Sequence, residues 1–162
     1  MAKKATKAFF ITSGPVAQNR RAHFDYEISE KFVAGIELKG TEVKSLRLGN
    51  CNINDAYAFE KNGEIYISNM SIGEYANKGY ESHSERRERR LLLKAKEIKQ
   101  IIGELSKKGS SLVAMRVFFN DRGLAKIELG LGKGKKLYDK RETQKERDWG
   151  REKQRIMVNA NH

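Results

Sequence analysis

The sequence predicts a mostly β fold: a small closed antiparallel barrel of about six strands, with one short helix and one long helix. Apolar residues alternate in several segments, as they do in half-buried strands. Two pairs of these segments are separated by turn sequences, which indicates antiparallel hairpins. No segment shows the strand–helix–strand order that is typical of a parallel sheet. A closed barrel of the oligonucleotide-binding (OB) kind fits these observations and hides its strand edges.

The chain of 162 residues suits one domain with an appendage. We divide it into a flexible basic arm (1–18), the OB-like barrel (19–132) and a basic C-terminal tail (133–162). Lysine and arginine total 33 against 21 acidic residues, a net charge of +12. This excess favours RNA, DNA or an anionic membrane surface as partner, because the cations would neutralise phosphates.

The barrel begins with a long alternating segment. Its apolar positions share one face and are Phe24, Tyr26, Ile28, Phe32, Ala34, Ile36 and Leu38. The pattern predicts two strands, or one strongly bent strand with a break at 29–31. Gly35 within the run suggests a bulge or a corner.

A short helix is predicted next, over residues 40–49. Thr41 is placed to cap its start, and Gly49 can end it in a left-handed conformation. A hairpin follows, with strands at 56–61 and 64–70. The Asn-Gly pair between these strands is the strongest two-residue turn signal.

The clearest helical pattern is an apolar stripe at spacings of four and three, made by Leu91, Ala95, Ile98, Ile102 and Leu105. Ser82 and Glu85 make a possible capping box before it, and Gly109 ends it. Leu92 lies roughly 100° around the helix from the stripe, so it is the apolar residue here with a possible role outside the core.

A second hairpin is predicted after this helix. Residues 113–119 alternate, 120–123 form the turn, and 127–131 alternate on the return.

The tail carries ten lysines or arginines against five acids between Lys133 and Arg155, with few apolar residues. Burying those few would not offset the cost of ordering the segment, so we expect it to be disordered alone. Acid-first pairs three residues apart favour a helix, which indicates folding on a polyanionic partner. A solubilising charge run is the alternative.

Aromatic residues in such a tail have no core to join. Tyr138 and Trp149 are therefore candidates for base stacking or for docking on a partner.

We expect no catalytic residue, metal site or cofactor, and hence no enzyme. The three histidines and the single Cys51 show no metal-ligand spacing. The glycine- and lysine-rich stretch 130–136 lacks the closing Gly-Lys-Ser/Thr of a P-loop. It suits close approach to a nucleic-acid backbone instead.

We expect a cytoplasmic protein. A lone cysteine fits a reducing compartment. No apolar run approaches the ~18 residues of a membrane span, and the N-terminus lacks the apolar core of a signal peptide. A membrane-surface role for the tail is disfavoured, because its scattered apolar residues form a poor stripe.

Six short stretches stand in a fixed order along the chain: NRRA at 19–22, GTEVKSLR at 40–47, RRLLLK at 89–94, GKGKKLYDKR at 132–141, KERDW at 145–149 and RIM at 155–157. Together they resemble the SsrA-binding proteins of bacteria (small protein B). Each stretch is weak alone, but six in register are highly specific.

The resemblance implies a six-stranded OB-type barrel with an added helix and a tail that is unstructured in the free protein. It implies binding to the tRNA-like domain of transfer-messenger RNA (tmRNA) and its delivery to stalled ribosomes for trans-translation. The barrel would sit in the decoding centre of the small subunit, and the tail would fold as a helix in the empty mRNA channel. A generic rRNA-binding or ribosomal OB-fold protein is the alternative, and we expect a monomer.

Site residues follow from the resemblance and from charge. Two positions depart from the family pattern: Phe24, where histidine is frequent, and Val33, where glutamate is frequent. The RNA-binding candidates are Asn19, Arg20, Arg21, Leu92, Lys133, Lys135 and Lys136. The candidates for ribosome binding by the tail are Tyr138, Asp139, Lys140, Arg141, Trp149, Ile156 and Met157.

Overall fold

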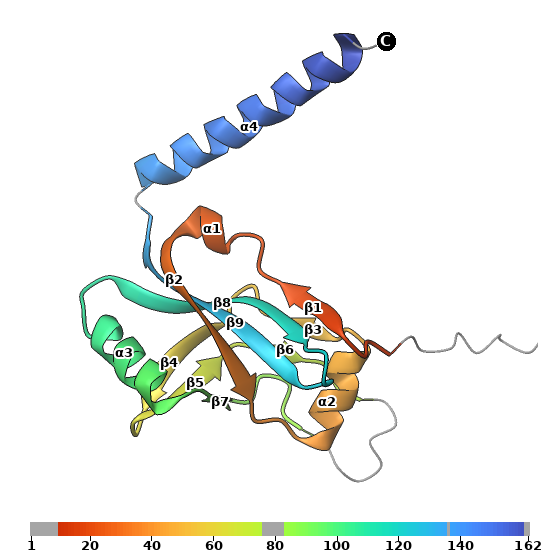
Figure 1. Ribbon diagram of the computed structural model, residues 1–162, viewed down its shortest axis with the longest axis vertical. Helices are drawn as coiled ribbons and strands as arrows, with labels where there is room; N and C mark the ends of the chain where they lie inside the picture. The colour runs from red at the N-terminus through yellow and green to blue at the C-terminus, as the bar shows by residue number, and fades with distance from the viewer. Residues whose placement is uncertain (1–9, 76–82, 136, 161–162) are drawn as a thin grey trace, which may run out of the picture.

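The structure, a computed structural model, describes residues 10–75, 83–135 and 137–160 (Figure 1). Its elements in chain order are β1 (Gly14–Gln18), α1 (Ala22–Asp25), β2 (Tyr26–Ile36), α2 (Gly40–Arg47), β3 (Cys51–Asn52), β4 (Tyr57–Lys61), β5 (Glu64–Ser68), β6 (Ser71–Ile72), β7 (Arg89–Leu92), α3 (Ala95–Leu105), β8 (Ser110–Phe119), β9 (Ala125–Gly134) and α4 (Leu137–Ala160).

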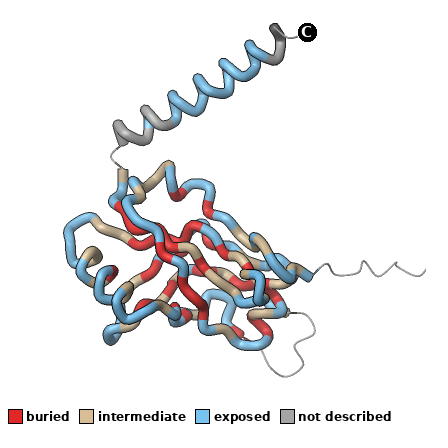
Figure 2. Tube along the Cα trace, in the orientation of Figure 1, coloured by how far each residue is buried: buried red, intermediate tan, exposed pale blue. Residues whose placement is uncertain are grey.

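Six antiparallel strands close into a ring in the order β8-β4-β5-β7-β2-β9, with β9 pairing back onto β8. This confirms the predicted closed, mostly β fold. Both predicted hairpins are present, as β4–β5 and β8–β9. The inward residues of alternate parity are fully buried, including Ile65, Ile67, Ile127 and Leu129. Figure 2 shows buried stretches of chain (red) along the barrel strands.

The last five residues of the expected N-terminal arm form a strand. β1 pairs with residues 116–119 of β8, while β4 pairs with the same edge of β8 only at Leu112 and Val113. β1 therefore covers the part of that edge which β4 leaves open, and so protects it from pairing with another chain.

β2 is a single strand with a register shift between Ile28 and Glu30, which confirms the break expected there. Gly35 is not a bulge, because it pairs in register with Lys126 on β9 and with Leu92 on β7. A Cβ atom at Gly35 would stand 3.2 Å from the Cβ of Leu92. Phe24 lies in α1 and not in a strand.

The cap of α2 differs from the prediction. Lys39 holds the N-cap position, and its backbone N–H donates to the Glu42 carboxylate at 2.9 Å. The Thr41 side chain instead bonds the buried imidazole of His83, with 2.9 Å between Oγ1 and Nδ1. Gly49 has a φ of +80°, as predicted for the residue that ends this segment.

The long helix begins later than predicted. Leu91 is a fully buried residue of β7, paired with Ile36 and Ile65, and α3 starts only at Ala95. The spacing of four from Leu91 to Ala95 fits a helix, but strand pairing decides the conformation. Ile98, Ile102 and Leu105 of the predicted stripe are partly buried against the core, as is expected of a core-facing stripe. Ala95 is exposed, and Ile101, which was not in the predicted stripe, is the most buried residue of α3. Ser82, of the expected capping box, lies outside the described residues.

α4 projects away from the barrel beside α1 (Figure 1). The Lys135 N–H donates to the Asp25 carbonyl at 2.9 Å, and the Arg147 guanidinium lies 5.8 Å from the centre of the Phe24 ring. From Gln144 to Met157 every residue is exposed. A helix that buries so little gains little from tertiary packing, so disorder of the tail in the free protein stays a prediction.

Candidate nucleic-acid interface

A hollow of about 460 Å³ opens where β1, α1, β2, β8 and β9 meet. Three permanent cations line it, against a single carboxylate, together with one imidazole and polar or apolar neighbours. A cationic hollow of this kind attracts phosphate groups. Its lining residues are Gln18, Asn19, Arg20, His23, Lys31, Met115, Arg116 and Glu128.

Asn19 lines this hollow but is not an exposed residue that would contact RNA through its side chain. Its side chain is buried, and its Nδ2 group donates to the carbonyls of Ala114 at 3.2 Å and Asn54 at 3.4 Å. Its Oδ1 atom accepts from the Arg21 N–H at 3.2 Å. The amide is thus used inside the protein, where it fixes the turn that presents Arg20 and Arg21.

The two arginines of that turn face solvent. Arg20 is exposed, and the Arg21 side chain is 77% exposed with a 3.9 Å ion pair to Asp25. The Arg21 guanidinium also lies 5.6 Å from the centre of the Phe24 ring. An exposed ion pair of this length contributes little to stability, so both cations remain available to an anionic partner.

Leu92 is 48% exposed on the outer face of β7, as predicted, although it lies on a strand. Gly35 stands opposite it on β2, and a Cβ there would be in tight contact with the Leu92 side chain. Val33, two residues earlier on β2, is also exposed, at 51%. The outer surface here is therefore flat and partly apolar.

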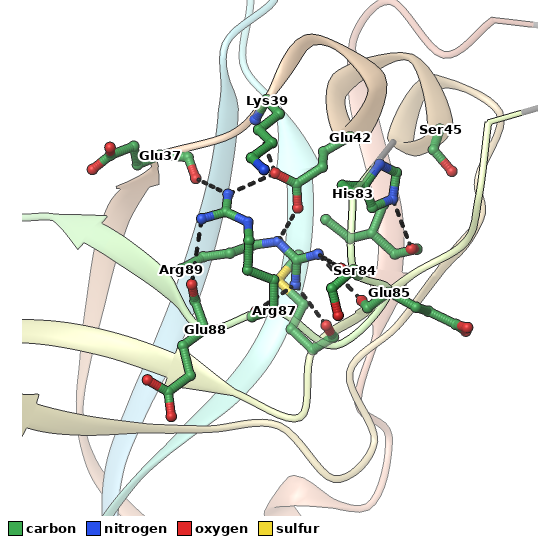
Figure 3. Close-up of polar contacts among 12 residues, drawn as sticks. Glu37, Lys39, Glu42, Ser45, His83, Ser84, Glu85, Arg87, Glu88 and Arg89 are labelled. Carbon is green, nitrogen blue, oxygen red and sulfur yellow. Dashed lines mark hydrogen bonds and ion pairs between the residues drawn. The ribbon is translucent and has the colours of Figure 1, made fainter. Parts of the chain in front are cut away.

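A buried ion cluster holds β7 in place (Figure 3). Arg89 is fully buried, donates from Nε to Glu42, and donates to the carbonyls of Met70, Arg87, Ser84 and Glu85. Arg87 donates to the same Glu42 carboxylate at 2.6 Å. The cluster ties α2 to the segment before β7, which directs Arg90 and Leu92 outward.

Two guanidinium groups keep Glu42 ionised. Burial acts to raise the pKa of the Glu42 carboxyl, but hydrogen bonds from Arg87, the Lys39 N–H and Arg89 outweigh burial and leave that pKa below its ordinary value. No sequence signal indicated this cluster, because Glu42 and Arg89 are 47 residues apart.

The tail candidates separate into three groups. Lys133 is exposed at the end of β9, and Lys135 is half-buried. Lys136 lies outside the described residues, as do the side chains of Tyr138, Asp139 and Lys140 within α4. The remaining candidates are exposed along α4, and they are Arg141, Trp149, Ile156 and Met157.

The single cysteine is not placed to act as a nucleophile. Burial raises the pKa of the Cys51 thiol to about 12, so this thiol is protonated and a poor nucleophile. Among the described residues, no group of three or more His, Cys, Asp or Glu side chains is placed to hold a metal ion. Nor is any described helix long and apolar enough to cross a lipid bilayer.

Sequence reasoning did not single out four residues that lie in or beside this candidate interface: Lys31, Lys126, Arg116 and Phe118. Alternation had placed residues 113–119 on two faces, and so implied that Arg116 and Phe118 point outward. Which strands lie beside them depends on the closure of the ring, because Phe118 pairs with Lys126 and Lys126 pairs with Gly35.

The chain resembles known proteins along most of its length. The model of the SmpB protein family matches residues 16–159. The SsrA-binding protein of Sinorhizobium fredii is 51% identical over 142 residues, which cover 88% of this chain and 89% of the relative. That of Caulobacter vibrioides is 51% identical over 145 residues, which cover 90% and 95%.

A solved structure, "tmRNA-SmpB: a journey to the center of the bacterial ribosome", contains a chain that is 46% identical to this one, with a TM-score of 0.64. The match covers 76% of this chain and 87% of the solved chain. A family model that spans most of the sequence, with relatives at half identity, is decisive: the chain belongs to the SmpB protein family.

Proposed function

We infer that this chain binds the tRNA-like domain of tmRNA and delivers it to stalled ribosomes for trans-translation, which rescues the ribosome and tags the unfinished peptide. The observation that carries this function is membership of the SmpB family along residues 16–159. The related chain in the solved ribosome structure, at 46% identity, gives the partners: tmRNA and the ribosome.

The barrel supplies the tmRNA-binding surface. Its support is the cationic hollow beside the Arg20–Arg21 turn, together with the exposed Leu92 on the outer face of β7. Arginine and lysine contacts to phosphates supply affinity that weakens with salt. We assign RNA contact to Arg20, Arg21, Leu92, Lys133, Lys135 and Lys136, and assign Asn19 the positioning of the two arginines.

The tail supplies the ribosome-binding element. Its described side chains from Gln144 to Met157 are exposed, and the segment from Lys133 to Arg155 has twice as many cations as acids. A helix with these properties suits the RNA-walled mRNA channel and decoding centre of the small subunit. The tail residues that we assign to this contact are Tyr138, Asp139, Lys140, Arg141, Trp149, Ile156 and Met157.

We propose further that the protein acts by binding alone, as a monomer in the cytoplasm, without an enzymatic step or a cofactor. The high pKa of the Cys51 thiol agrees with this, since that group is unsuited to attack a substrate. Stalled ribosomes and their messages are found where translation occurs, which is the reason for the cytoplasmic assignment.

Co-purification tests the function directly. The protein would carry an affinity tag at its N-terminus, which leaves the tail free, and the bound RNA would be sequenced. We expect one dominant structured RNA of tmRNA size. A random mixture of RNAs, or ribosomal RNA alone, would indicate a generic RNA-binding or ribosomal protein instead.

A matched pair of variants sharpens the test. Leu92→Asp places a charge on the outer face of β7. Tyr57→Asp places the same charge at a similarly exposed position, 45% against 48%, on β4, which is separated from β7 by β5 in the ring. We expect loss of the dominant RNA with the first variant and its retention with the second.

A further inference from the structure

Two arginines lie over phenylalanine rings that are consecutive in β8. The guanidinium carbon of Arg47 is 4.7 Å from the centre of the Phe119 ring, and that of Arg116 is 4.7 Å from the centre of the Phe118 ring. Because successive side chains of a strand point to opposite faces, Phe119 faces the core and Phe118 faces outward. The two pairs have equal spacing but different surroundings.

The inner pair is structural. Phe119 is 2% exposed, and Arg47 donates to the carbonyls of Ile11 at 3.1 Å and Gly123 at 3.2 Å. These two hydrogen bonds connect the Arg47 guanidinium to the segment before β1 and to the β8–β9 turn.

The outer pair has a solvent-facing side. The Arg116 side chain is 48% exposed, and its Nε atom donates to Glu128, whose side chain is 14% exposed. Lys31 lies 3.7 Å from the same carboxylate. The guanidinium is therefore held in place by a ring beneath it and a carboxylate beside it.

The outer pair also continues the candidate RNA surface. Phe118 pairs with Lys126, Lys126 with Gly35, and Gly35 with Leu92. The Lys126 ammonium lies 3.6 Å from where a Cβ of Gly35 would stand, so it covers the flat position between Phe118 and Leu92. Lys126 therefore lies between the Arg116–Phe118 pair and Leu92 on the outer surface.

We propose that the Arg116–Phe118 pair is a stacking subsite for one unpaired nucleobase of the bound RNA. A planar guanidinium supported on an aromatic ring offers a flat cationic face, and unstacked bases bind such faces. Lys126 and Lys31 lie beside it, where they meet the flanking phosphates. The subsite rests on the proposed function, since the base belongs to the RNA that the barrel binds.

Three variants and a tmRNA titration at fixed salt test the subsite. Arg116→Lys keeps the positive charge but loses the planar guanidinium group. Phe118→Ala removes the aromatic ring, and Phe118→Tyr is the control that keeps an aromatic ring. We expect the first two to weaken binding by about tenfold, the loss of a stacked base, and Phe118→Tyr to bind like the wild type. Arg116→Lys should leave the salt dependence unchanged, because that slope counts charges.

The outcomes separate the subsite from the function. If the wild type fails to bind tmRNA, the proposed function and the stacking subsite are both refuted. If it binds and all three variants bind within twofold of it, only the subsite is refuted. A benzophenone side chain at position 118 gives a second measurement that does not depend on Phe118→Ala folding: a crosslink to an unpaired nucleotide supports the subsite, and crosslinks only to base-paired nucleotides, or none, overturn it.

Discussion

Replacing Asn19 by alanine separates a positioning role from a direct RNA contact. The change removes three hydrogen bonds, from Nδ2 to the carbonyls of Ala114 and Asn54 and from the Arg21 N–H to Oδ1. Each hydrogen bond makes a net contribution of about 0.5–1.5 kcal/mol to stability. Because all three bonds are long, we expect the free energy of unfolding to fall by about 2 kcal/mol. For a domain of this size that lowers Tm by roughly 5–15 °C.

The assay is urea denaturation, followed by titration with tmRNA at two salt concentrations. Asn19→Ala should weaken RNA binding because the Arg20–Arg21 turn loses its anchor. Asn19→Asp keeps the acceptor but sets a buried anion against two carbonyls, so it should be less stable than Asn19→Ala. Arg20→Ala is the control: it should keep its stability, weaken binding and reduce the salt slope by about one charge.

A different pattern would refute this reasoning. If Asn19→Ala unfolds within about 0.5 kcal/mol of the wild type, a margin typical of surface changes, and still loses RNA affinity, Asn19 contacts the RNA itself.

Three further expectations concern other parts of the molecule. Leu92→Asp should lower RNA affinity with little change in Tm, whereas a large loss of Tm would show that Leu92 belongs to the core. The low pKa of Glu42 means that the folded state binds its proton less readily than the unfolded chain. The stability from Glu42 is therefore complete above its ordinary pKa and lost as pH falls through the folded value; acid titration of unfolding should show this loss, and Glu42→Gln should be less stable at pH 7 and lack that part of the acid dependence. Truncation after Lys136 removes no barrel strand, so Tm should stay within a few degrees and tmRNA should still bind; a collapse of Tm would show that the tail supports the barrel.

Local patterns predicted the hairpins because short-range signals determine them. The Asn-Gly turn and the alternation on either side specify β4 and β5 without reference to the rest of the chain. The assignment of Leu91 to a helix was wrong for the complementary reason. Its spacing to Ala95 suits a helix, while its pairing with Ile36 and Ile65 depends on strands far away in sequence.

Exposure was predictable for the candidate contacts Arg20 and Leu92, from charge in the first case and from a position off the buried stripe in the second. The candidate site was not predictable where function depends on distant partners. Asn19 bonds to residues 35 and 95 positions away, which is the basis of the positioning role that we propose for it. Arg116 and Phe118 acquire their neighbours only when the ring closes.

The tail gives the most direct test of the account, since it separates RNA binding from ribosome rescue. Ile156 and Met157 are 61% and 62% exposed near the end of α4, and burying each on the ribosome would contribute about 1.5–3 kcal/mol. The measurement is peptide tagging on stalled ribosomes by the double variant Ile156→Asp and Met157→Asp at saturating tmRNA. We expect tagging to collapse while tmRNA affinity changes little; tagging at the wild-type rate would contradict the account.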